Sequence, residues 1–247
     1  MAIELPTEIS KPEITGIPDN FSMVLFGQPK VGKTTFAAEF PDSILLECES
    51  GGAKYTSCKK VDINNITELR EAHKLLMSNE TFKTVIIDSI DKVAEWLEAE
   101  ICKSMHIKNI METKKGERFG SQWGEYKENV LKTMNAFLML NKKVIFIGHL
   151  KKADTDGNGG VINPKTINIY GQTATHILST IDNIGYMFAK EGTDKKIKRY
   201  LSFKAGEMVE SGSRCPAISD KVIELPLGKG YKAFEKCFTE YGKKEGK

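Results

Sequence analysis

The sequence lacks the signals of a secreted, metal-bound or membrane-spanning protein. Its five cysteines form no CxxC pair and are odd in number, so we expect neither a metal site built on cysteine nor a disulfide framework. No apolar run approaches the length that crosses a bilayer. Residues 1–6 have neither the basic nor the apolar segment of a signal peptide. We therefore expect a cytoplasmic protein that does not enter a membrane.

A strong charge of either sign is also missing. The formal net charge of +3 neither demands nor excludes nucleic acid, so the local distribution of charge must decide. A chain of 247 residues is long enough for one large α/β domain with a sizeable core. Proline and glycine among mixed charges mark an extended arm at 1–20. A core at 21–241 and a charged tail at 242–247 complete the expected organisation.

One stretch has a clear chemical meaning. An apolar run at 21–26 leads into a GxxxxGK[ST] loop, and helical periodicity follows it, which is the context that a P-loop requires. Glycines let the backbone N–H groups turn inward toward phosphates, Lys33 adds positive charge, and Thr34 offers a hydroxyl to Mg²⁺. The residues that we assign to nucleotide binding are Gly27, Gln28, Pro29, Lys30, Val31, Gly32, Lys33, Thr34 and Thr35.

The order of the expected elements predicts an α/β fold with a mainly parallel central sheet. Short apolar strands alternate with helices, as in sheets that are covered on both faces. We expect strands at 21–26, 43–48, 60–63, 83–88 and 143–149, helices at 67–77, 90–102, 126–140, 173–181 and 231–241, and a C-terminal antiparallel hairpin at 183–190 and 196–204. Thr67 is the expected N-cap of its helix. A polar loop is expected at 105–124, and a flexible turn or loop at 154–160.

Two acidic residues follow expected strands, where parallel sheets bind their ligands. Asp88 ends its strand in the manner of a Walker B acid that reaches Mg²⁺, although an Asp here can also cap the next helix. Glu49 is the candidate general base, because it lies further toward the end of its strand than Glu47. The alternative for Glu49 is a solvated acid beside a Gly-Gly turn.

His149 follows a third strand. It is a candidate sensor of the γ-phosphate, and the alternative is a histidine with a local hydrogen bond only. Glu49, Lys33 and His149 together form the expected catalytic set, and Thr34 and Asp88 form the expected metal site.

These motifs carry a family resemblance. The Walker A loop, the strand-end acid with Gly51-Gly52, the Walker B strand and the strand before His149 resemble the core of RecA-type ATPases. The stretches FKTVIIDSID (82–91) and VIFIGH (144–149) are more closely similar to phage-encoded single-domain AAA/RecA-like proteins, which include the Sak-type single-strand annealing ATPases. The resemblance covers about residues 21–225.

The resemblance implies a RecA-like fold and a DNA-stimulated ATPase that uses ATP and Mg²⁺. It also implies that identical subunits bind single-stranded DNA as a ring or filament, with the ATP sites between subunits. A role in phage recombination or replication would place the protein in the host cytoplasm, with phage proteins of those processes as partners. Two loops near the central axis would touch DNA, at about 105–124 and 150–167.

Local charge in the first loop agrees with such a role. Between residues 103 and 118, five lysines and arginines stand against two glutamates, and aromatic residues follow. Cations that track phosphates beside aromatics that stack on bases suit single-strand binding, but the same pattern fits a solvated loop whose aromatics dock it on the domain. The candidate DNA-binding residues are Lys114, Lys115, Arg118, Phe119 and Trp123 in the first loop and Lys151 and Lys152 in the second.

A cation acting on the ATP site of a neighbouring subunit is the remaining expected part. Lys204 and Arg214 are the candidates, and simple surface charge is the alternative for each. Two other functions stay open: an ATP-dependent switch or loader that acts on a protein partner such as a helicase, and a small-molecule kinase. The kinase ranks low because the sequence has no Arg-rich lid segment, and because Glu49 and His149 suit hydrolysis.

Overall fold

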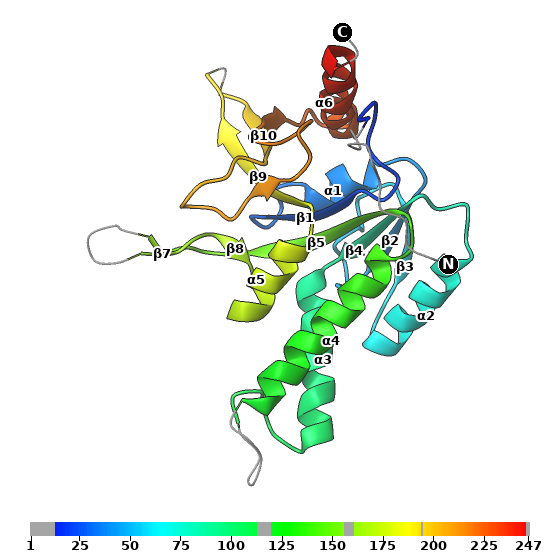
Figure 1. The fold of residues 1–247 in the computed structure, drawn as a ribbon, viewed down its shortest axis with the longest axis vertical. Coiled ribbons are helices and arrows are strands. Elements are labelled where there is room, and N and C mark those ends of the chain that lie inside the picture. Colours follow the sequence, from blue (N-terminus) through cyan, green and yellow to red (C-terminus); the bar gives the residue numbers. More distant parts are fainter. Residues whose placement is uncertain (1–12, 113–119, 156–160, 194, 246–247) are drawn as a thin grey trace, which may run out of the picture.

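Apolar runs without polar alternation form the centre of the fold, because their strands are covered on both faces. The computed structural model describes residues 13–112, 120–155, 161–193 and 195–245. Figure 1 shows the central sheet with α1 and α6 on one face and α2, α3, α4 and α5 on the other. This arrangement confirms the α/β fold with a mainly parallel sheet and C-terminal antiparallel strands.

The sheet has the strand order β12-β10-β9-β1-β5-β4-β2-β3, and β11 and β8 pair at its margins. The strands from β9 to β3 are parallel, whereas β10 is antiparallel to both β9 and β12. The strands are β1 (Ser22–Gly27), β2 (Ser43–Glu47), β3 (Lys59–Asp62), β4 (Thr84–Asp88), β5 (Lys143–Lys151), β6 (Asp154–Thr155), β7 (Val161–Asn163), β8 (Thr166–Ile167), β9 (Asn183–Glu191), β10 (Ile197–Ser202), β11 (Gly212–Ser213) and β12 (Val222–Glu224).

The helices divide the core into two clusters, one on each face of the sheet. They are α1 (Lys33–Ala38), α2 (Ile66–Met77), α3 (Ile90–Met105), α4 (Ser121–Leu138), α5 (Gly171–Thr180) and α6 (Gly230–Glu245). Along β1, Val24 and Phe26 join the cluster under α2 to α5, while Met23 and Leu25 join the cluster under α1 and α6. All four side chains are fully buried, so β1 contributes to the hydrophobic core on both faces of the sheet.

The ends of two helices differ from expectation. Asn65, not Thr67, caps α2, because its side-chain oxygen accepts the Glu68 N–H at 3.0 Å while the Glu68 carboxylate accepts the Asn64 N–H at 2.8 Å. Helix α4 begins at Ser121, inside the expected polar loop. The Gln122 amide holds this start by donating to the carbonyl oxygens of Ile110 and Glu112 at 3.1 and 2.9 Å.

The second expected loop is more regular than the sequence suggests. Strand β5 continues past His149 to Lys151 and pairs with β8, and β6 pairs with β7 as a short ribbon. The expected flexible turn therefore begins in a strand, and residues 156–160 lie outside the described part of the chain. The same holds for arm residues 1–12, tail residues 246–247, and the candidate DNA-binding residues Lys114, Lys115, Arg118 and Phe119. Among the helices that the structure describes, none combines the length and the apolar character needed to cross a membrane.

Candidate nucleotide site

The P-loop joins β1 to α1 at the carboxyl edge of the sheet. Gly27 lies so close to β9 that a Cβ atom there would be 2.1 Å from the Met187 carbonyl oxygen. Gly32 has a φ of 99°, in the left-handed region that side chains rarely adopt. Both glycines of the motif are therefore required by the local backbone.

Lys33 points back into the loop. Its Nζ atom donates to the carbonyl oxygens of Gly27 and Gln28 at 3.1 and 3.2 Å, and the side chain is buried. Burial lowers the pKa of Lys33, while nearby Asp88, Asp91 and Glu49 oppose that shift. The ammonium group of Lys33 therefore lies inside the curve of the P-loop.

Thr34 and Asp88 meet as expected of a magnesium site. The Thr34 hydroxyl donates to Asp88 Oδ2 at 2.6 Å, although the two residues are 54 positions apart. Desolvation raises the pKa of the Asp88 carboxyl, which lies at the end of β4. One hydroxyl and one carboxylate suit Mg²⁺, which takes few protein ligands and completes its shell with water and phosphate oxygens. Asp88 does not cap α3, because the N-cap is Ser89.

Glu49 and Glu47 have separate environments. The buried Glu47 carboxylate accepts the Ala53 N–H at 2.7 Å and pairs with Lys60, so it holds the turn after β2. Glu49 is only partly buried, accepts a hydrogen bond from the Ser89 hydroxyl, and lies 3.6 Å from His149 Nδ1. Of the two acids, Glu49 is therefore the one beside the other candidate catalytic groups.

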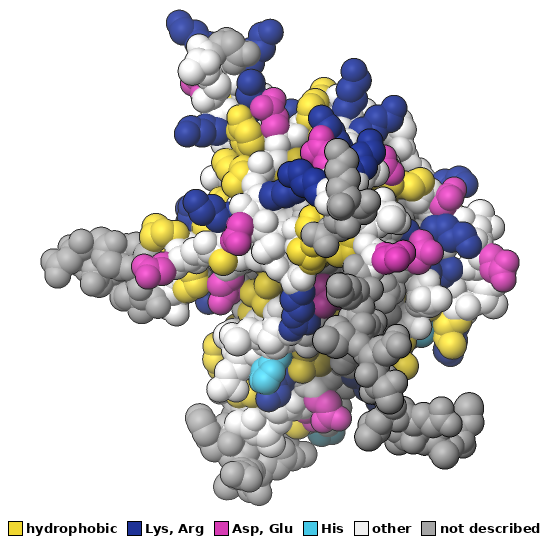
Figure 2. All heavy atoms as spheres, turned by 45° about the horizontal axis from the view of Figure 1, so that its top comes forward, with side chains coloured by type: hydrophobic (Ala, Val, Ile, Leu, Met, Phe, Trp, Pro, Cys, Tyr) yellow, Lys and Arg dark blue, Asp and Glu magenta, His cyan; other side chains and the backbone are white. Residues whose placement is uncertain are grey.

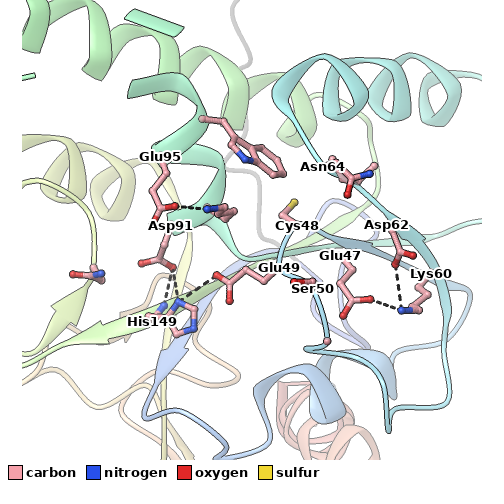
Figure 3. Close-up of a pocket in the computed structure, with 15 residues that line it drawn as sticks. Glu47, Cys48, Glu49, Ser50, Lys60, Asp62, Asn64, Asp91, Glu95 and His149 are labelled. Atoms are coloured by element: carbon pink, nitrogen blue, oxygen red, sulfur yellow. Dashed lines mark hydrogen bonds and ion pairs between the residues drawn. The ribbon is translucent and has the colours of Figure 1, made fainter. Parts of the chain in front are cut away.

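Asp91, which was not predicted from the sequence, holds His149. Asp91 Oδ2 accepts the His149 backbone N–H at 2.8 Å and lies 3.5 Å from the ring Nδ1 (Figure 3). Asp91 is 7% exposed, and its Oδ1 atom has no hydrogen-bond partner among the described residues. Its position three residues after Asp88, in the first turn of a helix that begins at the same sheet edge, was the available signal.

A cavity of about 690 Å³ opens beside these groups. Figure 3 shows Glu47, Glu49, Asp91 and His149 around it, and the side chain of Trp96 forms part of its wall. Carboxylates outnumber lysines in the lining, which also includes Asp62 and Glu95 against Lys60 and Lys92. The cavity therefore carries an excess of negative charge next to Glu49.

Comparison with known proteins assigns the family. The AAA domain profile matches residues 19–215, which include the P-loop, Asp88, Glu49 and His149. The chain belongs to the AAA domain family. It is a P-loop ATPase by family.

The fold of this AAA domain has counterparts among solved structures. A KaiC-like protein from the hyperthermophilic archaeon Pyrococcus horikoshii OT3 superposes with a TM-score of 0.50, over 87% of this chain and 89% of that chain. Their sequence identity is 16%, so the likeness concerns the fold alone. No curated protein gave a match.

The candidate cations of the AAA domain lie away from its own P-loop. Arg214 pairs with Asp182 at 3.1 Å, just before β9, and thus at the edge of the sheet opposite the P-loop. Lys204 is exposed two residues after β10. Neither contacts the site of its own chain, which is the geometry that a cation acting on a neighbouring subunit would need.

The described candidate DNA-binding residues differ in their packing. Lys151 is exposed at the end of β5 and Lys152 follows it, two and three residues beyond His149. Trp123 is partly buried and makes edge contacts with Tyr170 and Tyr126, at centroid distances of 5.0 and 6.2 Å. This packing favours the alternative in which the aromatic residue docks the loop on the AAA domain.

Replacing Asp91 by asparagine should lower the pKa of His149. That pKa is raised above its ordinary value, first by the hydrogen bond to Asp91 and then by the negative charges of Asp91 and Glu49, against the effect of burial. Asparagine keeps the size of the side chain and loses its charge, so the imidazole should release its proton at a lower pH. An NMR titration of the His149 ring measures the shift.

The raised pKa of His149 also makes the free energy of unfolding depend on pH. Because the folded pKa of His149 lies above the unfolded one, its contribution to the free energy of unfolding is complete below the unfolded pKa of about 6.5 and is lost as pH rises through the folded value. Glu95→Gln is the matched control, since Glu95 pairs with Lys92 and not with His149. An unchanged titration in Asp91→Asn would remove Asp91 from this role.

Proposed function

We propose that this AAA domain protein binds ATP with Mg²⁺ and hydrolyses it. The observation that carries the proposal is the 2.6 Å contact between Thr34 and Asp88, made beside the buried Lys33 and on the same sheet edge as Glu49 and His149. The candidate metal ligands Thr34 and Asp88, the cation Lys33 and the candidate base Glu49 thus come together from three separate segments of the chain, and His149 adds a fourth.

In this mechanism the protein supplies position and charge. Thr34 and Asp88 would hold Mg²⁺, which neutralises phosphate charge when bound. Lys33 exchanges its carbonyl partners in the loop for phosphate oxygens. Glu49, fixed by the Ser89 hydroxyl, accepts a proton from the attacking water as the water oxygen bonds to the γ-phosphorus and the bond to ADP breaks. His149 contacts Glu49 and is held by Asp91, so it is placed to sense the γ-phosphate.

We further propose that identical subunits assemble as a ring or filament on single-stranded DNA, in phage recombination or replication. The basic composition of 103–118, together with Lys151 and Lys152 near His149, supports DNA contact. The positions of Lys204 and Arg214 support action on a neighbouring subunit. Figure 2 shows Lys and Arg side chains, with Asp and Glu between them, on the upper part of the face in view.

The decisive experiment is the rate of ATP hydrolysis with and without single-stranded DNA. Mass in solution, measured in parallel with a non-hydrolysable ATP analogue, reports assembly. DNA-stimulated turnover with assembly supports the proposal. Turnover without any DNA effect supports only the ATPase part, and phosphorylation of a metabolite without release of phosphate supports the kinase alternative.

Affinity for single-stranded DNA should fall steeply with salt and should drop in a Lys114→Ala, Lys115→Ala, Arg118→Ala triple variant. Loss of three phosphate contacts would make the slope of log K against log salt concentration shallower by about 2, because each contact on a single strand contributes about 0.7. Fluorescence anisotropy of a labelled oligonucleotide at several salt concentrations measures both quantities.

The matched control removes three exposed lysines of α6, namely Lys232, Lys236 and Lys243. It lowers the net charge by the same amount at a different surface. If both triple variants lost the same affinity for single-stranded DNA, the loss would come from the lower net charge of the protein. That result would exclude the first loop from the DNA site.

A second candidate function has support of its own. In the cavity beside Glu49 carboxylates outnumber lysines, and this excess of negative charge repels a phosphate backbone and attracts a basic protein segment. An ATP-dependent switch or loader that acts on a protein partner such as a helicase would use this surface. Turnover that responds to a partner protein and not to DNA would favour that function.

A further inference from the structure

A second cavity adjoins the one beside Glu49 and lies between α3, α4 and the segment that leads into α5. Its volume is about 300 Å³, and Asp91 and Asn168 belong to the lining of both cavities. The proposed hydrolysis gives a role to Asp91 but to no other side chain of this second cavity. Its lining consists of Asp91, Ala94, Glu95, Glu98, Tyr126, Lys151, Asn168, Ile169 and Tyr170.

One wall of this cavity is an acidic face of α3. Asp91, Glu95 and Glu98 recur at spacings of four and three residues, which places them on the same side of the helix. The pKa of Glu98 is raised, first by burial and then by the charge of Glu95. Lys151 is the one cation in the lining, and it is exposed and forms no ion pair with a described residue. The wall therefore carries more negative than positive charge.

The spacing of these carboxylates does not suit a metal ion. Among the residues that the structure describes, no group of three or more acidic, histidine or cysteine side chains is placed to hold one. A cation that answers several separated carboxylates must be larger than a metal ion and must carry several hydrogen-bond donors. The acidic wall therefore favours an organic cation.

Two polar groups of the cavity are buried without a partner. Asp91 is 7% exposed, and its Oδ1 atom accepts no hydrogen bond within the described ranges. Tyr126 is 1% exposed, and its hydroxyl likewise has no hydrogen bond to a described residue. Burial, followed by the charge of Glu98, raises the pKa of that hydroxyl, so the group stays neutral. Because buried polar atoms are normally hydrogen-bonded, these two indicate a ligand.

Aromatic rings form another part of the wall. Tyr126 on α4 and Tyr170, the N-cap of α5, have ring centroids 5.8 Å apart, and Trp123 packs against Tyr170 at 5.0 Å. The rings are therefore held in place by two helices. A flat cation can lie against such a ring while it donates hydrogen bonds to carboxylates.

We propose that this cavity binds the guanidinium group of an arginine side chain that belongs to another polypeptide. A guanidinium is planar and has five N–H donors, which match Asp91 Oδ1, the Glu98 carboxylate and the Tyr126 hydroxyl oxygen. An ammonium group is compact and more strongly hydrated, so it fits a half-buried site with an aromatic wall less well. The bound guanidinium pairs with the same carboxylate that holds His149, so the partner acts on the candidate catalytic edge.

The acidic wall also distinguishes the source of the guanidinium. Free arginine brings its own carboxylate toward Glu95 and Glu98, whereas an arginine within a polypeptide has no such charge. The inference does not depend on nucleotide binding, because the cavity lies outside the P-loop and needs no phosphate.

Titration with blocked arginine tests the proposal. NMR of the full chain, without nucleotide, follows the ring resonances of Tyr126 and Tyr170 as N-acetyl-arginine amide is added. Both should shift with one common dissociation constant. N-acetyl-citrulline amide has nearly the same shape without the charge, and it should leave the resonances unchanged. Free arginine and N-acetyl-lysine amide should bind more weakly than blocked arginine.

Two variants assign the binding to this cavity. Tyr126→Phe should raise the dissociation constant about two- to tenfold, the effect of one lost hydrogen bond, and it keeps the ring that packs against Tyr170. Glu98→Gln should raise it about three- to tenfold, because Glu98 is half-buried and loses its charge. Glu128→Gln is the matched control, since Glu128 is exposed on α4 and lines neither cavity.

Four results would contradict the proposal. Resonances that do not move with blocked arginine, or that move equally with blocked citrulline, would overturn the guanidinium site. Free arginine that binds as tightly as blocked arginine would overturn the assignment to a polypeptide. An unchanged constant in both Tyr126→Phe and Glu98→Gln, or an equal loss in Glu128→Gln, would place the binding elsewhere. Failure of ATP hydrolysis would leave these titrations unaffected, so the two proposals fail separately.

Discussion

Replacing Glu49 by glutamine should reduce the rate of ATP hydrolysis by a factor of about 10² to 10⁴ while ATP still binds. The amide has nearly the size of the carboxylate, and its oxygen can still accept the hydrogen bond from the Ser89 hydroxyl. It cannot take a proton from water, so the chemical step loses its base. The P-loop and the Thr34–Asp88 pair are untouched, so the dissociation constant of ATP should remain close to that of the unmodified protein.

Glu47→Gln provides the matched control for that experiment. Glu47 lies two residues away on the same segment, but it is buried against Lys60 and the Ala53 N–H. Loss of its charge should lower the melting temperature and leave turnover per folded molecule unchanged, because a charge buried in a pair contributes to folding and not to the chemistry. Near-normal turnover in Glu49→Gln, or a larger loss of turnover in Glu47→Gln, would show that Glu49 is not the base.

Replacing Lys33 by alanine should abolish detectable hydrolysis and weaken the binding of ATP at least tenfold. A hydrogen bond between charged groups contributes about 1.5–3 kcal/mol, and 1.4 kcal/mol corresponds to a factor of ten. Lys33 is the buried cation of the loop, and its present partners are two carbonyl oxygens that phosphate oxygens would replace. Titration calorimetry and a phosphate-release assay measure the two effects.

The chain contains a closely matched lysine for comparison. Lys142 is also buried, and its Nζ atom also donates to two carbonyl oxygens, those of Asn79 and Phe82. It lies before β5, at the sheet edge opposite the P-loop. Lys142→Ala should therefore destabilise the fold without changing the affinity for ATP. A similar loss of ATP binding in both variants would trace the effect of Lys33→Ala to folding.

The arrangement of the site was predictable because a parallel sheet fixes where its strands end. Asp88, Glu49 and His149 are far apart in the sequence, yet each lies at or near the carboxyl end of a strand of the same direction, so they meet at one edge. Local periodicity was enough to place those strands, since both faces of each are buried and the apolar runs are continuous. Of the residues at this sheet edge, only the P-loop and Asp88 belong to recognisable sequence motifs.

Side-chain partners that depend on packing could not be predicted in this way. Asp91 occupies a helical position with ordinary spacing, and only the approach of β5 to α3 brings it to His149. Asn65 caps α2 because Glu68 stands three residues after it and returns a bond to the neighbouring Asn64 N–H, whereas Arg70, three residues after Thr67, has no carboxylate to return one. The contact of Trp123 with Tyr170 depends on the packing of α4 against the start of α5, which the sequence does not reveal.

Trp96 gives the molecule a built-in optical probe. The chain has two tryptophans, and Trp96 forms part of the wall of the cavity beside Glu49, while Trp123 sits in the aromatic group with Tyr126 and Tyr170. Intrinsic fluorescence therefore comes from two separate regions, one next to the catalytic groups and one at the base of the first loop. A Trp123→Phe chain leaves a single emitter at the cavity, so occupancy there can be followed in solution without attaching a dye.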